Sequence, residues 1–159
     1  MDQSDELTLW LADAWLRASG DEIQSLVVED LREQVEDGGS MADGLASLSH
    51  SERQAGDFGM EIAGTLLAPV LVELLKDFWA GYFKKLGESA GGAVAEATTK
   101  RVKDWFLSIL HKKEDDKVLT DLREKVERLA AHKKLTQKEA ARLLEALHGP
   151  KLVQELETK

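Results

Sequence analysis

The four histidines come first in a search for chemistry, because an imidazole ring can bind a metal ion or transfer a proton near neutral pH. They are His50, His111, His132 and His148. None of them has a second histidine at a recognised ligand spacing. The chain has no cysteine, which excludes disulfides, thiolate metal sites and thiol nucleophiles. The sequence therefore predicts no metal centre.

Motifs for other kinds of catalysis are also missing from the sequence. There is no nucleophile elbow, no phosphate-binding loop and no dinucleotide fingerprint. The segment from Gly87 to Gly92 is rich in glycine, but Ala and Val follow it where a phosphate-binding loop has Lys and Ser or Thr. We therefore expect a protein that is not an enzyme and that uses no cofactor, metal ion or small-molecule substrate.

A cluster of basic residues lies beside two aromatic residues near position 100. Lys100, Arg101 and Lys103 precede Trp105 and Phe106. Such a pattern can bind nucleic acid or anionic lipid. A solvated helix face opposite a buried Trp105 is the simpler interpretation, and an overall charge of -9 argues against nucleic acid. We expect the three basic residues to serve as secondary contacts to a protein partner.

The N-terminal segment predicts a helix from Asp5 to Ala18 that is apolar nearly all round. Trp10 and Trp15 add bulk on faces outside its main leucine and alanine stripe. A short terminal helix of this kind is hard to bury completely within a small bundle. Either both tryptophans pack inside, or one of them lies in a partner interface, where Trp is favoured. Trp10 and Trp15 are therefore the first candidates for partner contacts.

The charge of the chain is unevenly distributed. Residues 1–61 contain 15 Asp and Glu against 3 Lys and Arg, a net charge of -12, and residues 62–159 contain 15 against 18, a net charge of +3. Two solvated surfaces of different bias would explain this difference. The alternative is that the acidic half docks on the basic half or on a basic partner.

The stretch from Phe58 to Leu86 is the expected centre of the fold. It contains a charge-free window, 62–72, and two apolar stripes at helical spacing, so it predicts a helix that is wrapped by the rest of the chain or held against a partner or a membrane. Pro69 lies inside this stretch. Because a proline in a helix interior removes one hydrogen bond and clashes with the preceding turn, we expect a kink or a break near this residue.

The rest of the sequence also predicts helices and no strands. Gly20 ends the first helix and Asp21 caps the second, which runs to Asp37 with Ile23, Leu26, Val27, Leu31 and Val35 expected on one inward face. Further helices are expected over 88–110 and 115–133. Another follows Thr136, whose spacing to Glu139 is that of a capping box. The predicted fold is an all-α, irregular bundle of five to seven helices.

These patterns divide the chain into an acidic N-terminal helical subunit (1–48), a polar linker or hinge (49–57) and a helical core domain (58–159). The sequence predicts a protein–protein interaction module, an adaptor, regulator or assembly subunit that uses exposed apolar helix surface to bind a protein partner or a second copy of itself. An acidic N-terminus without a basic region favours a cytoplasmic protein over a secreted one.

A membrane-active effector is the alternative function. In this hypothesis residues 62–110 form a helical hairpin that the acidic N-terminal helices restrain. The charge asymmetry and the polar 49–57 segment motivate it. Glu73, Lys76 and Asp77 interrupt the apolar run and argue against insertion, so a membrane is the less favoured partner.

Overall fold

The computed structural model describes residues 3–46, 67–90, 99–112, 117–132 and 134–158, with the backbone alone at 83–90 and 112. No strand occurs in these ranges, and the all-α prediction is confirmed. Residues 41–46 are helical as well. The labelled helices are α1 (Gln3–Ala18), α2 (Glu22–Glu36), α4 (Leu67–Ala90), α5 (Thr99–Lys112), α6 (Lys117–Ala131), α7 (Gln137–His148) and α8 (Pro150–Glu157).

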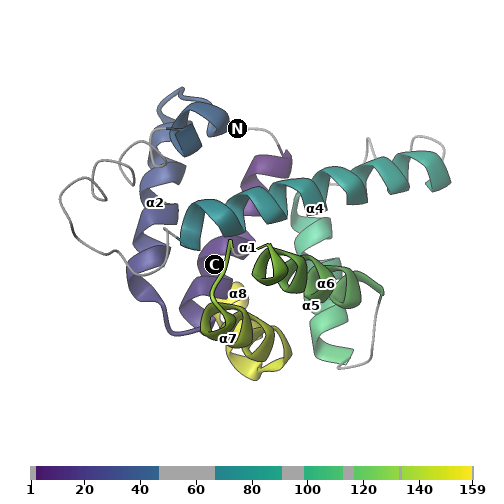
Figure 1. Ribbon diagram of the computed structural model, residues 1–159. Helices are drawn as coiled ribbons and strands as arrows, with labels where there is room; N and C mark the ends of the chain where they lie inside the picture. The colour runs from purple at the N-terminus through teal and green to yellow at the C-terminus, as the bar shows by residue number, and fades with distance from the viewer. Residues whose placement is uncertain (1–2, 47–66, 91–98, 113–116, 133, 159) are drawn as a thin grey trace.

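Helix α1 lies at the centre of the bundle (Figure 1). Every residue from Leu7 to Leu16 is buried. α1 contacts α2, α4, α5, α7 and α8, so a neighbouring helix covers each of its faces. A helix that is apolar all round is stable in water only when it is enclosed in this way. The N-terminal helix therefore forms the centre of the core.

The expectation that 58–86 forms the wrapped central helix is wrong for the part that the structure describes. α4 buries one side, which includes Leu71, Leu75 and Trp79, and exposes Glu73 and Asp77 on the other. It runs along one face of the bundle as a long helix (Figure 1). The enclosed position belongs to α1, because α1 has no polar stripe to turn toward water.

Pro69 lies in the first turn of α4, two residues after its start at Leu67. Proline is tolerated there, since the first N–H groups of a helix have no partner within it. One of these groups is satisfied from outside, because the backbone N–H of Ala68 donates to Gln24 Oε1 of α2 at 2.9 Å. The predicted break near Pro69 thus takes the form of a helix start. Residues 58–66 of the expected central stretch lie outside the described residues.

The helix ends follow local sequence signals. Gly20 has φ of +87°, and the N–H groups of Gly20 and Asp21 donate to the carbonyls of Arg17 and Leu16. This is the glycine-terminated arrangement expected at the end of a helix. Asp21 then caps α2 by accepting from the N–H of Gln24.

The capping box at the start of α7 is confirmed. The N–H of Glu139 donates to the Thr136 hydroxyl at 3.1 Å, and the N–H of Thr136 donates to the Glu139 carboxylate at 3.0 Å. Both bonds satisfy donors that the first turn leaves free. The predicted start of this helix was therefore right to the residue.

Aromatic side chains connect α1, α4 and α5. The Phe106 ring lies 6.2 Å from Trp10 and 5.9 Å from Trp79, measured between ring centroids. The first pair is edge-to-face and the second is tilted, and aromatic pairs at such distances add to the gain from area burial. At the outer end of the cluster, Tyr82 stacks on Trp105 at 4.4 Å.

The two parts expected on either side of 49–57 share one hydrophobic core. Leu7 and Leu16 of α1 belong to the same buried cluster as Trp79 of α4 and Leu143 of α7. The proposed linker itself lies outside the described residues. Within the described ranges, no helix combines the length and the apolar character needed to cross a membrane.

Candidate interaction surface on helix α2

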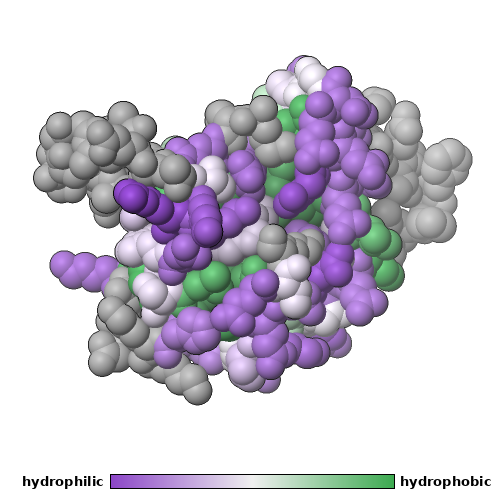
Figure 2. All heavy atoms as spheres, turned by 180° about the vertical axis from the view of Figure 1, so that it is seen from behind, coloured by the Kyte–Doolittle hydropathy of each residue, from purple (hydrophilic) through white to green (hydrophobic). Residues whose placement is uncertain are grey.

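The outer face of α2 carries two large apolar side chains in water. Ile23 is 74% exposed and Leu26 is 57% exposed, and these are the exposed large hydrophobic residues of the described part of the chain. Single exposed apolar residues are ordinary on protein surfaces, but two neighbours on one helical face form a small patch. Figure 2 shows hydrophobic atoms among hydrophilic ones at the edge of the molecule that α2 forms. We call Ile23 and Leu26 the α2 patch.

The opposite face of α2 fixes this orientation. Val28, Leu31 and Val35 are buried in the core. Ile23 precedes Val28 by five residues and Leu26 precedes Leu31 by five, which is a rotation of about 140° around a helix. The packing of the valine and leucine stripe against α1 and α4 therefore points the α2 patch away from the bundle.

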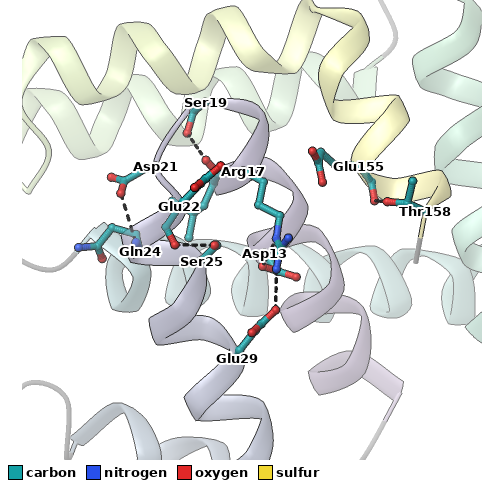
Figure 3. Close-up of polar contacts among 11 residues, drawn as sticks. Asp13, Arg17, Ser19, Asp21, Glu22, Gln24, Ser25, Glu29, Glu155 and Thr158 are labelled. Carbon is teal, nitrogen blue, oxygen red and sulfur yellow. Dashed lines mark hydrogen bonds and ion pairs between the residues drawn. The ribbon is translucent and has the colours of Figure 1, made fainter.

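An ion-pair network also holds α2 in place (Figure 3). Arg17 of α1 donates from Nε to Asp13 Oδ1 at 3.1 Å and from Nη2 to Glu29 Oε1 of α2 at 2.6 Å. Asp13 is 1% exposed, so its charge would be costly without this contact. The network joins the C-terminal half of α1 to the middle of α2.

Acidic residues continue the outer face of α2 on the C-terminal side of the α2 patch. On the exposed face, Ile23 and Leu26 are followed at steps of four, three and four residues by Asp30, Glu33 and Asp37, all exposed. Such steps keep the residues on one side of the helix. The outer face of α2 is thus apolar near its N-terminus and negative along the rest. A partner for it needs apolar side chains together with positive charge.

The sequence expectation for α2 was partly wrong. It placed Ile23 and Leu26 on one face with Val27, Leu31 and Val35. Val27 is partly buried and packs against the core, as expected, but Ile23 and Leu26 do not. The structure instead divides the apolar residues between a buried stripe, which includes Val28, and the exposed α2 patch. The spacing of five residues between the members of the two groups is the signal that could have separated them.

Trp10 and Trp15, the first candidates for partner contacts, are both buried, at 2% and 0% exposed. The indole N–H of Trp15 donates to the Leu143 carbonyl at 2.8 Å. Phe78 and Trp79 are buried as well, at 4% and 0%. The chain therefore encloses the aromatic surface that the sequence suggested for a partner, because α1 runs through the bundle rather than over it.

Two of the three basic candidates lie on the surface, and the third contacts α1. Lys100 and Arg101 are exposed on α5. Lys103 is largely covered, with Nζ 3.8 Å from Glu6 Oε1 and 5.3 Å from the centroid of the Trp10 ring. Its cation–π contact and ion pair connect α5 to α1. Lys103 is thus engaged within the chain.

One pocket in the described part of the chain is lined by titratable side chains that are open to water. This pocket of about 470 Å³ lies where α5, α7 and α8 meet, and it is lined in part by His111, His148 and Glu157. His111 Nε2 lies 2.8 Å from Glu157 Oε1, but both side chains are more than half exposed, at 58% and 51%. Burial raises the pKa of the Tyr82 phenol. Among the described residues, no three His or acidic side chains are grouped to hold a metal ion.

Comparison with protein-family models, with curated proteins and with solved structures finds no match for this chain. Any functional conclusion therefore depends on the surface of this molecule alone.

Proposed function

We propose that the chain is a non-enzymatic protein–protein interaction module, an adaptor, regulator or assembly subunit, that binds its partner through the outer face of α2. The observation that carries the proposal is the exposure of Ile23 and Leu26 on a helix whose other face is fixed in the core. Full burial of one such side chain contributes roughly 1.5–3 kcal/mol. The α2 patch can therefore supply a useful part of a binding free energy.

The partner that fits this face is a basic amphipathic helix of another protein. Its apolar residues would cover Ile23 and Leu26, and its Lys or Arg residues would lie along Asp30 and Glu33. Charge complementarity of this kind raises the association rate and selects among partners. A second α2 fits poorly, because its acidic residues would meet like charges.

The test compares the tagged wild-type chain with Ile23→Ser/Leu26→Ser and with a matched control, Lys138→Ser/Ala141→Ser, on the exposed face of α7. A protein retained by the wild type and the control is identified, purified and titrated by calorimetry. We expect the α2 variant to weaken this purified complex at least about tenfold, which corresponds to about 1.4 kcal/mol. Added salt should weaken the wild-type complex further.

Two results would overturn the proposal. One is a purified partner that binds the α2 variant as tightly as the wild type. The other is that the wild type retains nothing from its native cells that the α2 variant does not also retain.

The membrane-active alternative receives less support. α4 contributes Leu71, Leu75 and Trp79 to the core and packs against α1 and α2, so its apolar face is already occupied. Residues 91–98 of the supposed hairpin lie outside the described residues. Leakage from liposomes, measured for the full chain and for a chain that begins at Asp57, separates the two functions. A cytoplasmic location belongs to the favoured proposal and is consistent with a chain without cysteine.

A further inference from the structure

A groove of about 270 Å³ lies between α4 and α6, which run next to each other on the face seen in Figure 1. Its floor is apolar and consists of Val70 and Leu74 from α4 and Leu129 from α6. Val70 and Leu129 are only partly buried, although they pack against the core. The groove is separate from the α2 patch, since none of its lining residues belongs to α2.

The two walls of the groove carry opposite charges. Glu73 and Asp77 form the acidic α4 wall. The opposite, basic α6 wall consists of Lys125 and Arg128 from α6 and of His132 and Lys134, which follow the end of that helix. Among the described residues, no ion pair within 4.0 Å joins one wall to the other. The charged side chains along both walls are therefore available to another molecule.

We propose that this groove is the interface of a homodimer with two-fold symmetry. In an isologous contact, both copies use the same surface. If one residue of the first copy touches a second residue of the other copy, then the same two residues also touch with the copies exchanged. When two copies face each other across a two-fold axis along the groove, the acidic α4 wall of each copy meets the basic α6 wall of the other. The apolar floors face each other between the paired walls.

A second copy suits the groove better than a partner of one charge. A uniformly acidic segment would be repelled by Glu73 and Asp77, and a uniformly basic segment would be repelled by Lys125 and Arg128. An apolar strip flanked by one negative and one positive strip complements itself. The chain thus carries on one surface both halves of the contact that it needs.

The contact is small. The α4 strip from Val70 to Asp77 is roughly 10 Å long, and the charged groups at its edges stay close to water. We therefore expect a weak dimer that dissociates on dilution and on addition of salt.

Charge reversal tests the proposal in the full chain. One variant is Glu73→Lys/Asp77→Lys, which makes both walls positive. The other is Lys125→Glu/Arg128→Glu, which makes the α6 wall net negative, because Lys134 remains, and leaves the α4 wall negative. Sedimentation equilibrium over a range of concentrations should show that each variant alone dimerises at least about tenfold more weakly than the wild type, because like charges face each other. Circular dichroism checks that each variant is folded, and Glu73→Gln/Asp77→Asn replaces the first if it is not.

The equal mixture of the two reversed variants is the decisive sample. In a mixed two-fold dimer, each positive wall meets a negative wall, so the mixture should dimerise within about threefold of the wild type, a difference of less than about 0.7 kcal/mol. The Ile23→Ser/Leu26→Ser variant should dimerise like the wild type, which separates this inference from the α2 proposal. A wild-type chain that stays monomeric at millimolar concentration, or a mixture that stays as weak as its components, would overturn the inference.

Discussion

Replacing Trp15 by phenylalanine tests the position of α1 in the fold. Trp15 is 0% exposed, and its indole N–H donates to the Leu143 carbonyl of α7 at 2.8 Å. Phenylalanine keeps most of the apolar volume but removes the donor. If α1 is the enclosed central helix, the substitution leaves a buried carbonyl without this bond and a small void beside it. If Trp15 instead faced a partner, the free chain would lose little stability.

The magnitude follows from these two losses. The Leu143 carbonyl lies inside α7 and keeps its helical bond, so loss of the bond from Trp15 costs roughly 0.5–1.5 kcal/mol, and the void adds to that cost. We expect a loss of about 2 kcal/mol or more in the free energy of unfolding. For a chain of 159 residues this corresponds to a fall in Tm of about 4–8 °C, at about 2–4 °C for each kcal/mol.

Urea unfolding followed by far-ultraviolet circular dichroism measures this change without depending on tryptophan fluorescence. Ile23→Ala is the matched control, because the side chain is 74% exposed and surface substitutions usually stay within about 0.5 kcal/mol. The enclosed position of α1 would be contradicted if Trp15→Phe were as stable as the wild type, or if Ile23→Ala were the more destabilising of the two.

Three further substitutions test local parts of the structure. Arg17→Met should destabilise the chain by about 1–3 kcal/mol in urea unfolding, because it removes the ion pair that Arg17 makes with the buried carboxylate of Asp13. Arg17 is one-third exposed, so solvent screening limits this loss. Arg142→Met, on the surface of α7, is the control and should leave the stability unchanged. Thr136→Ala should cost about 1 kcal/mol by removing the cap of α7, measured as a lower urea midpoint. Burial raises the pKa of Tyr82 above its ordinary 10.0, so the unfolded chain loses this proton first and stability should fall as pH rises above that value. Tyr82→Phe should reduce this alkaline slope between pH 9 and 11 and leave the profile near neutrality unchanged, and an identical slope in both proteins would contradict the assignment.

The sequence predicted the parts of the fold that depend on local signals. Gly20 ends α1 and Asp21 caps α2, as the residue types required. Thr136 and Glu139 mark the start of α7 because both bonds of a capping box lie within four residues of the chain. Such bonds are formed by neighbours in sequence, so tertiary packing has little influence on them.

The position of α1 could not be predicted in the same way. Trp10 and Trp15 on different faces of one helix show that α1 is apolar all round, but this pattern suits both a core helix and a helix covered by a partner. The choice depends on how many other helices contact α1. Among the described helices, α2, α4, α5, α7 and α8 contact it, and they come from segments as distant in sequence as α8. That information lies in the long-range packing and not in the periodicity of the segment itself.

The α2 patch was missed for a related reason. Ile23, Leu26 and Val27 extend the apolar side of α2, so the sequence suggested one broad inward face. The structure buries only the stripe through Val28, Leu31 and Val35, since α1 and α4 cover a limited arc of the helix. Counting apolar residues gave the presence of α2 correctly but not the direction in which each residue points.

Site-specific photo-crosslinking from position 23 in the native cells is the most direct test of the α2 surface. A photoreactive residue replaces Ile23 in one protein and Ala141, which is exposed on α7, in the control. We expect an intermolecular adduct from position 23 that is absent from position 141 and whose crosslinked segment is a basic amphipathic helix. Adducts confined to the same chain, or equal adducts from both positions, would contradict the claim that α2 carries the binding surface.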